Sequence, residues 1–208
     1  MQPVIKIAVV EDNTDIQEMV GTIIKSENQF QLTGVFSTAE TFLLSLHIEK
    51  PDIVIMDLGL PAMSGVEAIQ IISTQYPGIQ CIVFTIHDSN QNVFEALTAG
   101  ACGYLLKGAG KEKIVQSIIS CFEGGSPMSS SIARKVVEIM YKKNNLIHVL
   151  SHREQDVLQG LKDGLSYHDI AQKLDISLHT VRTYIRTIYE KLQVHSKTDA
   201  INKIFKSY

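Results

Sequence analysis

Side chains of complementary chemistry end four apolar stretches of this sequence. They are two adjacent acids, a single acid, a hydroxyl and an ammonium: Glu11 and Asp12, Asp57, Thr85, and Lys107. Carboxylates that crowd together repel one another and need a cation, and such oxygen ligands suit Mg²⁺. A carboxylate beside a metal ion and a lysine can attack a phosphoryl group and form an acyl phosphate. If these side chains converge, Asp57 is the candidate phosphoryl acceptor.

Each of these residues also has an ordinary structural interpretation. Glu11 and Asp12 could cap a helix, and Asp57 could cap a turn. Thr85 and Lys107 could simply end strands at the surface. For any one residue alone the ordinary interpretation is favoured. Because such polar residues end four separate stretches, the chemical interpretation is favoured for the set, provided that the fold brings the four ends together.

The four stretches belong to a pattern of alternating strands and helices. Residues 53–56 form an apolar, β-branched run bounded by turn residues, which is typical of a strand buried on both faces. Four further strands are predicted at residues 6–10, 31–36, 81–84 and 103–106. Helices are predicted at residues 14–26, 37–46, 65–75, 93–99 and 112–122. The alternation predicts an α/β, flavodoxin-like fold with a five-stranded, doubly wound parallel sheet, whose carboxyl strand ends share one edge.

Two local expectations concern residues outside the candidate site. Ser37 and Glu40 have the spacing of a capping box at the start of the second helix. The three cysteines, Cys81, Cys102 and Cys121, are widely spaced in apolar surroundings and fit neither a metal site nor a disulfide framework. We therefore expect them to be buried, reduced thiols.

The composition excludes several classes of protein. With 45% hydrophobic and 20% charged residues, the chain of 208 residues can form a packed core and is not expected to be disordered. No apolar run approaches the roughly 20 residues of a membrane helix, and the N-terminus lacks the layout of a signal peptide. We therefore expect a cytoplasmic protein with no membrane partner.

The net charge of −3 is unevenly distributed along the chain. Residues 1–122 hold 6 basic and 13 acidic side chains, whereas residues 151–208 hold 9 basic and 7 acidic ones. An acidic first part and a mildly basic second part indicate two modules with different partners. Between them, residues 123–127 break the preceding helix, and residues 129–141 have the spacing of one more helix.

The second module has the pattern of a helix-turn-helix domain. A capping box at Ser151 and Glu154 opens a first helix, and Ser166 opens a second. After a tight turn, Ser177 caps a longer third helix, and a fourth is expected at about residues 197–205. Two short helices joined by such a turn, the second of them longer, are typical of a helix-turn-helix.

The third helix of this module carries candidate DNA contacts. Arg182 and Arg186 are four residues apart and share one face, with Thr183 beside them. Arginine suits guanine in the major groove, and Thr180 and Lys191 could hold phosphates. The alternative is a small helical bundle that binds protein and whose arginines are merely solvated.

Residues 3–122 resemble the receiver domain of two-component response regulators. The matching segments are Val9–Asp12, Met56–Gly65, Val83–Thr85 and Ala99–Lys107. The resemblance implies that Asp57 is phosphorylated and that Mg²⁺ is held by Glu11, Asp12, Asp57 and the carbonyl of Gly59. It further implies that Thr85 and Lys107 contact the phosphoryl group. Tyr104 matches the aromatic switch residue, whose ring turns inward when Thr85 moves toward that group, although it could also be an ordinary half-buried strand aromatic.

Three positions around this motif depart from the usual pattern or vary within it. Ile86 follows Thr85 where the family usually has Ala, Ser or Gly. A branched side chain there could crowd the route to Asp57, which puts the rates of phosphorylation and hydrolysis in doubt more than the chemistry. Gly59 and His87 occupy variable positions that could also influence dephosphorylation.

Residues 149–206 resemble the helix-turn-helix domain of the LuxR and NarL/FixJ type. The matching segments are Leu150–Leu158, Gly164–Ser166, Asp169–Ala171, Thr180–Arg182 and Ile188–Leu192. The resemblance implies base contacts from Arg182, Thr183 and Arg186, and dimerisation through the last helix around Ala200, Ile201 and Ile204. Tyr184 and Asp169 depart from the commoner His and Glu, which leaves the DNA sequence preference open.

Together the two resemblances cover nearly the whole chain in the order typical of NarL/FixJ response regulators. We predict a receiver domain at residues 1–122, a linker with a helix at 123–148, and a LuxR-type DNA-binding domain at 149–208. The predicted protein is a transcription regulator rather than an enzyme, phosphorylated on Asp57 by a sensor histidine kinase and acting on double-stranded DNA as a homodimer. Two rivals are a metal-dependent phosphohydrolase and a DNA-binding regulator that works without phosphorylation, under the control of a partner protein.

Overall fold

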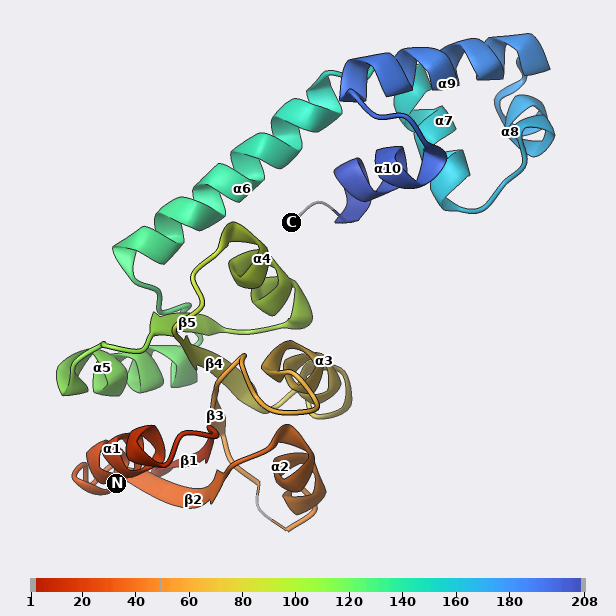
Figure 1. The fold of residues 1–208 in the computed structure, drawn as a ribbon. Helices are drawn as coiled ribbons and strands as arrows, with labels where there is room; N and C mark the ends of the chain where they lie inside the picture. Colours follow the sequence, from red (N-terminus) through yellow and green to blue (C-terminus); the bar gives the residue numbers. More distant parts are fainter. Residues whose placement is uncertain (1–2, 49, 207–208) are drawn as a thin grey trace. The chain divides into compact units, whose positions relative to one another are not determined.

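The computed structural model describes residues 3–48 and 50–206, with their side chains except at 142–148 and 206. The chain divides into two compact units, Met1–Val136 and Val137–Tyr208. The first unit contains a sheet with helices on both faces, and the second is helical (Figure 1). The predicted domain boundaries at residues 122 and 148 are not tested by this division and stay predictions.

Five parallel strands form one sheet in the order β2-β1-β3-β4-β5. They are β1 (Ile5–Val10), β2 (Phe30–Phe36), β3 (Ile53–Met56), β4 (Gln80–Thr85) and β5 (Gly103–Leu106). Every residue of β3 is buried, as its uninterrupted apolar sequence predicts. The doubly wound parallel sheet is therefore confirmed, and the carboxyl ends of its strands lie at one edge.

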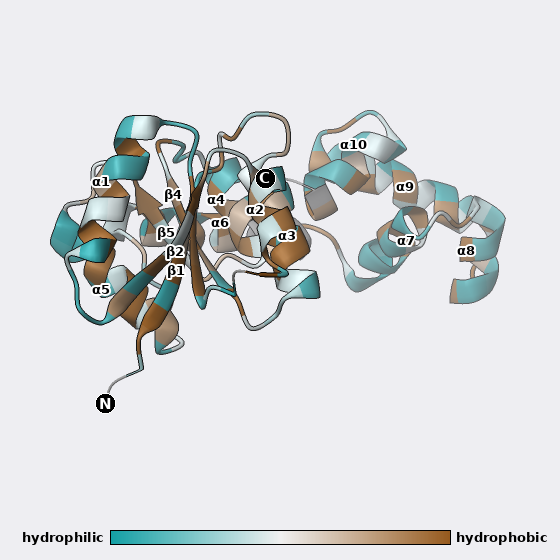
Figure 2. Ribbon diagram, turned by 90° about the horizontal axis from the view of Figure 1, so that it is seen from below, coloured by the Kyte–Doolittle hydropathy of each residue, from teal (hydrophilic) through white to brown (hydrophobic). Residues whose placement is uncertain are grey.

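Helices cover both faces of the sheet: α1 and α5 lie on one side, and α2, α3 and α4 lie on the other (Figure 2). Their bounds are α1 (Thr14–Lys25), α2 (Ala39–Ser45), α3 (Gly65–Gln75), α4 (Asn90–Ala99) and α5 (Lys111–Phe122). Ile24 of α1 and Ile118 of α5 are fully buried in one apolar cluster with Ile7, Ile53 and Ile82 of the strands. This burial against the helices holds the strands, and hence their polar ends, in place.

The predicted capping box at Ser37 and Glu40 is wrong. The N-cap of α2 is Thr38, whose hydroxyl accepts a hydrogen bond from the amide of Thr41. The carboxylate of Glu40 instead accepts a hydrogen bond from the amide of Met63, at 3.0 Å, in the loop between β3 and α3. Glu40 thus binds a residue 23 positions away in the sequence instead of the N-cap that its local spacing suggested.

The segment after α5 pairs with β5, the strand at the edge of the sheet. The amide of Tyr104 donates to the carbonyl of Pro127 at 2.9 Å, and Tyr104 forms a parallel bridge with Met128. A Cβ on Gly103 would lie 2.8 Å from the ring of Pro127, so only glycine leaves room for this approach. The helix α6 (Ser130–His148) follows directly.

The second unit consists of α7 (His152–Lys162), α8 (Tyr167–Leu174), α9 (Leu178–Leu192), α10 (Lys197–Ile201) and the π-helical segment η1 (Asn202–Lys206). The capping box predicted at Ser151 and Glu154 is present. Asp175, at φ 53°, forms the left-handed end of α8 in the tight turn before α9. The predicted helix-turn-helix is therefore confirmed. The predicted fourth helix is α only as far as Ile201.

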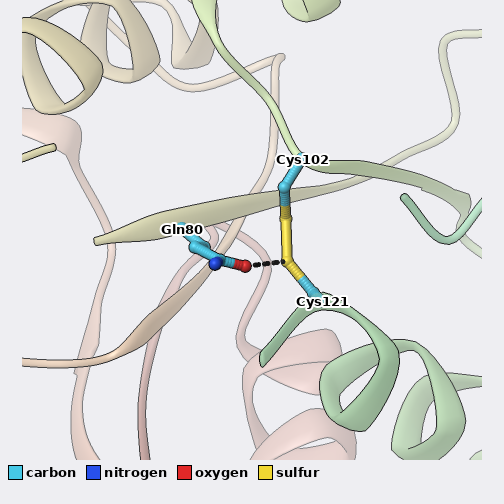
Figure 3. Close-up of a disulfide and its surroundings, with 3 residues drawn as sticks. All are labelled: Gln80, Cys102 and Cys121. Carbon is cyan, nitrogen blue, oxygen red and sulfur yellow. Dashed lines mark hydrogen bonds between the residues drawn. A yellow bond between two sulfur atoms is a disulfide. The ribbon is translucent and has the colours of Figure 1, made fainter. Parts of the chain in front are cut away.

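The expectation of three reduced thiols is wrong for two of the cysteines. Cys102, just before β5, and Cys121, in α5, form a disulfide (Figure 3). Cys81 is a buried free thiol, as predicted. The spacing in sequence does not reveal this pair, because the two cysteines meet only when α5 packs against the sheet beside β5.

Candidate functional site

Lys107 joins two acidic side chains at the carboxyl edge of the sheet. Its ammonium lies 2.8 Å from Oδ2 of Asp57 and 2.9 Å from Oε1 of Glu11. Asp57 and Glu11 are almost completely buried, whereas Asp12 is exposed beside them. One carboxylate oxygen from each acid can be chosen so that the three lie within 4.8 Å of one another. The fold thus brings together the acids and the lysine that the sequence singled out.

The turn after β3 fixes the position of Asp57. The amide of Leu58 donates to Oδ1 of Asp57 at 2.7 Å. A Cβ on Gly65 would lie only 1.9 Å from the backbone carbonyl oxygen of Asp57, so a side chain cannot be accommodated there. The capping box of Ser64 and Glu67 starts α3 at this same point. The first turn of α3 is thus held tightly against the end of β3.

Burial and charge shift the pKa values of the groups around Asp57. Burial raises the pKa of Glu11, and hydrogen bonds from Lys107 and Asn13 only partly offset it. Burial acts to lower the pKa of Lys107, but its hydrogen bonds to Asp57 and Glu11 outweigh that effect, so the pKa is raised and the ammonium stays charged. A single ammonium therefore faces two buried acids.

The acidic cluster suits a hard divalent cation. Oε2 of Glu11 is buried, and the ammonium of Lys107 lies 2.7 Å from it. The exposed Asp12 opens the cluster to solvent on one side. Carboxylate oxygens at this separation match the ligands that Mg²⁺ prefers.

Thr85 and Tyr104 lie in the interior next to this site. Thr85 is fully buried, and its hydroxyl accepts a hydrogen bond from the amide of His87 at 3.3 Å. The ring of Tyr104 is fully buried as well, and its hydroxyl donates to the carbonyl of His87 at 2.6 Å. Burial, with further contributions from Asp88 and Asp57, raises the pKa of Tyr104, so the phenol stays protonated and able to donate. Tyr104 is thus a core residue rather than a half-buried one.

The variable positions lie on the solvent side of Asp57. Ile86 is 72% exposed, so its side chain is not packed into the interior. Nε2 of His87 lies 3.2 Å from the point where a Cβ on Gly59 would be, and Oδ2 of Asp57 lies 3.7 Å from that point. The imidazole therefore occupies space near Asp57 that a larger residue at position 59 would take.

The start of α6 contacts the loop between β4 and α4, a relationship that no local sequence pattern indicates. Ile132 is fully buried. The ammonium of Lys135 lies 2.7 Å from Oδ2 of Asp88 and also donates to the backbone carbonyl of Asp88. Asp88 directly follows His87, whose carbonyl accepts the hydrogen bond from Tyr104. The loop beside Thr85 is therefore bonded to both β5 and α6.

In the second unit, α9 presents the candidate DNA contacts to solvent. Arg182, Thr183 and Arg186 are exposed, and Thr180 is half-buried, with its hydroxyl 2.8 Å from that of Ser177. The opposite face of α9 is buried in a core that includes Val181, Ile185 and Ile188. The exposed face of this helix therefore carries two guanidinium groups.

Lys191 makes an ion pair inside its own unit. Its ammonium lies 2.8 Å from Oε2 of Glu154, which is only 5% exposed. Burial acts to raise the pKa of Glu154, but the hydrogen bonds from Lys191 and Ser151 outweigh it and lower the pKa. Glu154 also belongs to the capping box of α7, so this pair joins the start of α7 to the end of α9. In this structure Lys191 therefore stabilises the packing of α7 and α9, and its ammonium is not free to contact a phosphate.

The residues expected at a dimer interface are partly turned inward. Ala200 and Ile204 are buried in the core of the second unit, and Ile201 is half-buried against it. Their burial supports the packing of α10 and η1 on α7. Thr198 and Asp199 of α10 are exposed, and the role of this region in a dimer stays a prediction.

Comparisons with known proteins match both units. The family described as the response regulator receiver domain matches residues 7–119, and the luxR family of bacterial regulatory proteins matches residues 148–204. The chain is 28% identical to the uncharacterized transcriptional regulatory protein YxjL of Bacillus subtilis, over 95% of this chain and 93% of the relative. It is 27% identical to the transcriptional regulatory protein DegU of Brevibacillus brevis, over 98% of this chain and 94% of the relative.

A solved structure with the same fold is RcsB of Salmonella enterica serovar Typhimurium bound to promoter rprA in the presence of the phosphomimetic BeF3-. It superposes with a TM-score of 0.61 at 19% identity, covering 97% of this chain and 98% of RcsB. Across residues 3–48 and 50–206, no helix combines the length and the apolar character needed to cross a membrane.

Proposed function

Because this chain belongs to the response regulators, which here join a receiver domain to a LuxR-type regulatory domain, we propose that phosphorylation of Asp57 controls its binding to DNA. The phosphoryl donor would be a sensor histidine kinase, and the outcome would be regulation of transcription from the bound promoter. Such a protein works in the cytoplasm. The observation that carries the proposal is the meeting of Asp57, Glu11 and Lys107 at one sheet edge, within hydrogen-bonding distance.

The transfer step can be derived from the side chains present. A carboxylate oxygen of Asp57 attacks the phosphorus of the donor phosphohistidine. The new O–P bond forms as the P–N bond breaks, and the donor imidazole takes up the electron pair. Lys107, which now pairs with Asp57, would then pair with a phosphoryl oxygen and neutralise its charge.

Mg²⁺ would be held by Glu11, Asp12, Asp57 and the carbonyl of Gly59. When bound, it supplies positive charge to the phosphoryl oxygens. The chain's own contribution is to keep Glu11 and Asp57 fixed and close, by burial and by the hydrogen bond from Leu58 to Asp57. Asp12 would complete the set from the solvent side.

The phosphoryl group would act on the loop between β4 and α4. The hydroxyl of Thr85, which now accepts a hydrogen bond from the amide of His87, would donate one to a phosphoryl oxygen and turn toward that group. The same loop is bonded to Tyr104 and to Lys135 of α6. A rearrangement at Thr85 would therefore reach the start of α6, the helix that continues toward the DNA-binding domain.

The DNA-binding domain would place α9 in the major groove. Arg182, Thr183 and Arg186 would contact base edges, and Thr180 with the N-terminus of α9 would contact phosphates. Lys191 would contribute a phosphate contact only if it leaves Glu154. A homodimer formed near α10 would bind two half-sites, and activation of the receiver would favour that dimer.

The buried ring of Tyr104 favours a second candidate function. The ring is packed in the core and its hydroxyl donates to the carbonyl of His87, so contacts within the chain itself hold it in the inward position. A regulator that binds DNA without phosphorylation, under the control of a partner protein, is therefore the alternative.

One experiment separates the two functions. The intact mass of the protein is measured after incubation with Mg²⁺ and acetyl phosphate, for the wild type, Asp57→Asn and the control Asp88→Asn. We expect one added phosphoryl group in the wild type and the control and none in Asp57→Asn. DNA affinity measured in parallel should rise on phosphorylation. An affinity that is the same in Asp57→Asn and in the treated wild type would establish the alternative. If no adduct forms on the folded wild type, repeating the measurement with Ile86→Ala shows whether that side chain blocks the donor.

A further inference from the structure

We propose that Cys102 and Cys121 form a reversible redox site, at which a small-molecule disulfide or a hydroperoxide makes a covalent bond between the start of β5 and α5. Figure 3 shows the pair beside Gln80 of β4. The two cysteines are 19 residues apart in sequence, and their Cα atoms are 6.4 Å apart, within the usual span of a disulfide. The backbone of this fold therefore accommodates the bond.

The surroundings of Cys121 suit the reduced state as well as the oxidised one. Its sulfur lies 2.9 Å from Oε1 of Gln80, at a geometry in which a thiol donates its proton to the amide oxygen. A disulfide sulfur has no proton to donate, so this contact is a hydrogen bond only in the thiol form. Gln80 therefore offers Cys121 a hydrogen-bond acceptor when the disulfide is reduced, which favours a reversible site.

The two cysteines differ in their access to solvent. Cys121 is fully buried, whereas Cys102 is half-buried at the border of the same apolar cluster. An external oxidant therefore reaches Cys102 first, and Cys121 acts from the interior as the second thiol. The third cysteine, Cys81, is buried, and burial raises its pKa to about 12, so its thiol stays protonated and unreactive.

The chemistry balances in two steps for each class of oxidant. A hydroperoxide converts the thiol of Cys102 to a sulfenic acid and is itself reduced to water or an alcohol. The sulfur of Cys121 then attacks that of Cys102, forming the S–S bond and releasing water with the proton of the Cys121 thiol. A small-molecule disulfide instead forms a mixed disulfide with Cys102, and attack by Cys121 releases a second small thiol.

The disulfide lies at the part of the receiver domain from which the chain continues toward α6. Cys102 precedes Gly103 and Tyr104, which contact Pro127 at the point where the chain leaves toward α6. Cys121 lies in the last turn of α5, directly before that segment. Oxidation thus ties the end of α5, from which the linker emerges, to the start of β5, against which the linker packs. Disulfides in the cytoplasm are usually transient and serve redox sensing, so this part of the proposal rests on the proposed function.

Thiol counting on the full-length protein tests the site itself. The protein is incubated with oxidised glutathione or with hydrogen peroxide, then alkylated and mapped by mass spectrometry, before and after dithiothreitol. We expect Cys102 and Cys121 to be linked to each other, Cys81 to be alkylated only after denaturation, and dithiothreitol to restore both thiols in the folded state. The variant Cys81→Ala should behave as the wild type.

Single-cysteine variants identify the order of reaction and the oxidant. When Cys121→Ala is treated with oxidised glutathione, glutathione should remain attached to Cys102. When the same variant is treated with hydrogen peroxide, dimedone should trap a sulfenic acid on Cys102. If Cys121→Ala does not fold, Cys102→Ser replaces it, and Cys121 should then resist both oxidants. The proposal is overturned if both thiols stay free in folded wild type, if Cys81 takes part in the bond, or if dithiothreitol cannot reduce it.

DNA binding tests the link to output. Affinities of the reduced and oxidised protein are compared with and without phosphorylation of Asp57, with Cys102→Ser as the variant that cannot be oxidised. We expect oxidation to reduce the gain in affinity on phosphorylation by about fivefold or more, at the lower end of couplings between sites. Equal gains in both redox states would overturn the link to output. A protein that shows the thiol chemistry but no DNA binding in any state would contradict the proposed function instead.

Discussion

The ammonium of Lys107 lies 2.8 Å from Oδ2 of Asp57, and both side chains are nearly inaccessible to solvent. Lys107 also contacts Glu11, so it is the only cation near two buried acids among the residues that the structure describes. Removing it leaves like charges in a region of low dielectric, where they cost more than in water.

We therefore expect Lys107→Met to destabilise the protein by about 3 kcal/mol in the absence of divalent cations. Because Mg²⁺ can replace the missing charge, millimolar Mg²⁺ should restore more stability to the variant than to the wild type. Urea unfolding with and without Mg²⁺ measures both effects. Lys111→Met is the control, since its ion pair with Glu27 is partly exposed and should contribute less than about 1 kcal/mol. Equal stability of Lys107→Met and the wild type would contradict the assignment of Lys107 as counterion.

Gly65 should tolerate no side chain. A Cβ there would lie 1.9 Å from the carbonyl oxygen of Asp57, so Gly65→Ala must push α3 away from the end of β3. We expect a loss of about 3 kcal/mol or more in unfolding free energy and a slower reaction of Asp57 with acetyl phosphate. Gly78→Ala is the matched control, because nothing lies within 4 Å of its Cβ position, and its stability should change by less than about 0.5 kcal/mol. The close approach would be refuted by two variants of equal stability.

The comparison between sequence and fold shows which features are encoded locally. Apolar strands ending in Asp57, Thr85 and Lys107 are a local signal, and the rule that parallel strands share a carboxyl edge is enough to bring these residues together. The capping box predicted at Ser151 and Glu154 is equally local and is present, and Ser166 begins α8 as predicted.

Features that depend on packing between distant segments could not be predicted in the same way. The disulfide requires that α5 lie beside the start of β5, and the contact of Glu40 with Met63 requires that α2 lie beside the loop after β3. The position of Lys191 on α9 suggests a contact with a DNA phosphate. Its ion pair with Glu154 becomes visible only when α7 and α9 pack together.

Arg182 and Lys191 should therefore respond differently to substitution. Arg182 is exposed, so Arg182→Ala should leave stability within about 0.5 kcal/mol of the wild type and weaken binding to the cognate site by about 1–3 kcal/mol. Lys191→Met should instead lower stability and leave the salt dependence of DNA affinity unchanged. Fluorescence anisotropy at several salt concentrations, together with thermal unfolding, measures these quantities. A reduced salt slope in Lys191→Met at unchanged stability would restore Lys191 as a phosphate contact.

The pair of Glu154 and Lys191 should make stability depend on pH. The pKa of Glu154 is lowered below its ordinary value of 4.5 in the folded protein, so the unfolded chain binds its proton more tightly. The resulting stability is fully present above pH 4.5 and is lost as the pH falls through the lower, folded pKa. Relative to Glu154→Gln, which can keep the cap, the wild type should be more stable at pH 7 by no more than about 1 kcal/mol, because Lys191 is partly exposed. Urea midpoints of both proteins should converge as the pH falls below 4.5. A difference that stays constant would show that the charge of Glu154 contributes nothing.

The contact of Lys135 with Asp88 should hold the start of α6 on the receiver domain. The ion pair is partly exposed, so Lys135→Met should cost less than about 1 kcal/mol in global stability. Locally, however, the ammonium bonds both the side chain and the backbone carbonyl of Asp88, so its removal should loosen the loop after β4 and the first turns of α6. Hydrogen exchange should therefore become faster in residues 86–89 and 131–135, whereas Lys113→Met, at an exposed lysine of α5, should leave both segments protected.

Because this loop also accepts the hydrogen bond of Tyr104, Lys135→Met should also diminish the rise in DNA affinity on phosphorylation of Asp57. Unchanged exchange in both segments would mean that α6 is held by Ile132 and the Pro127 contact alone, and that the signal from Asp57 reaches the linker through β5.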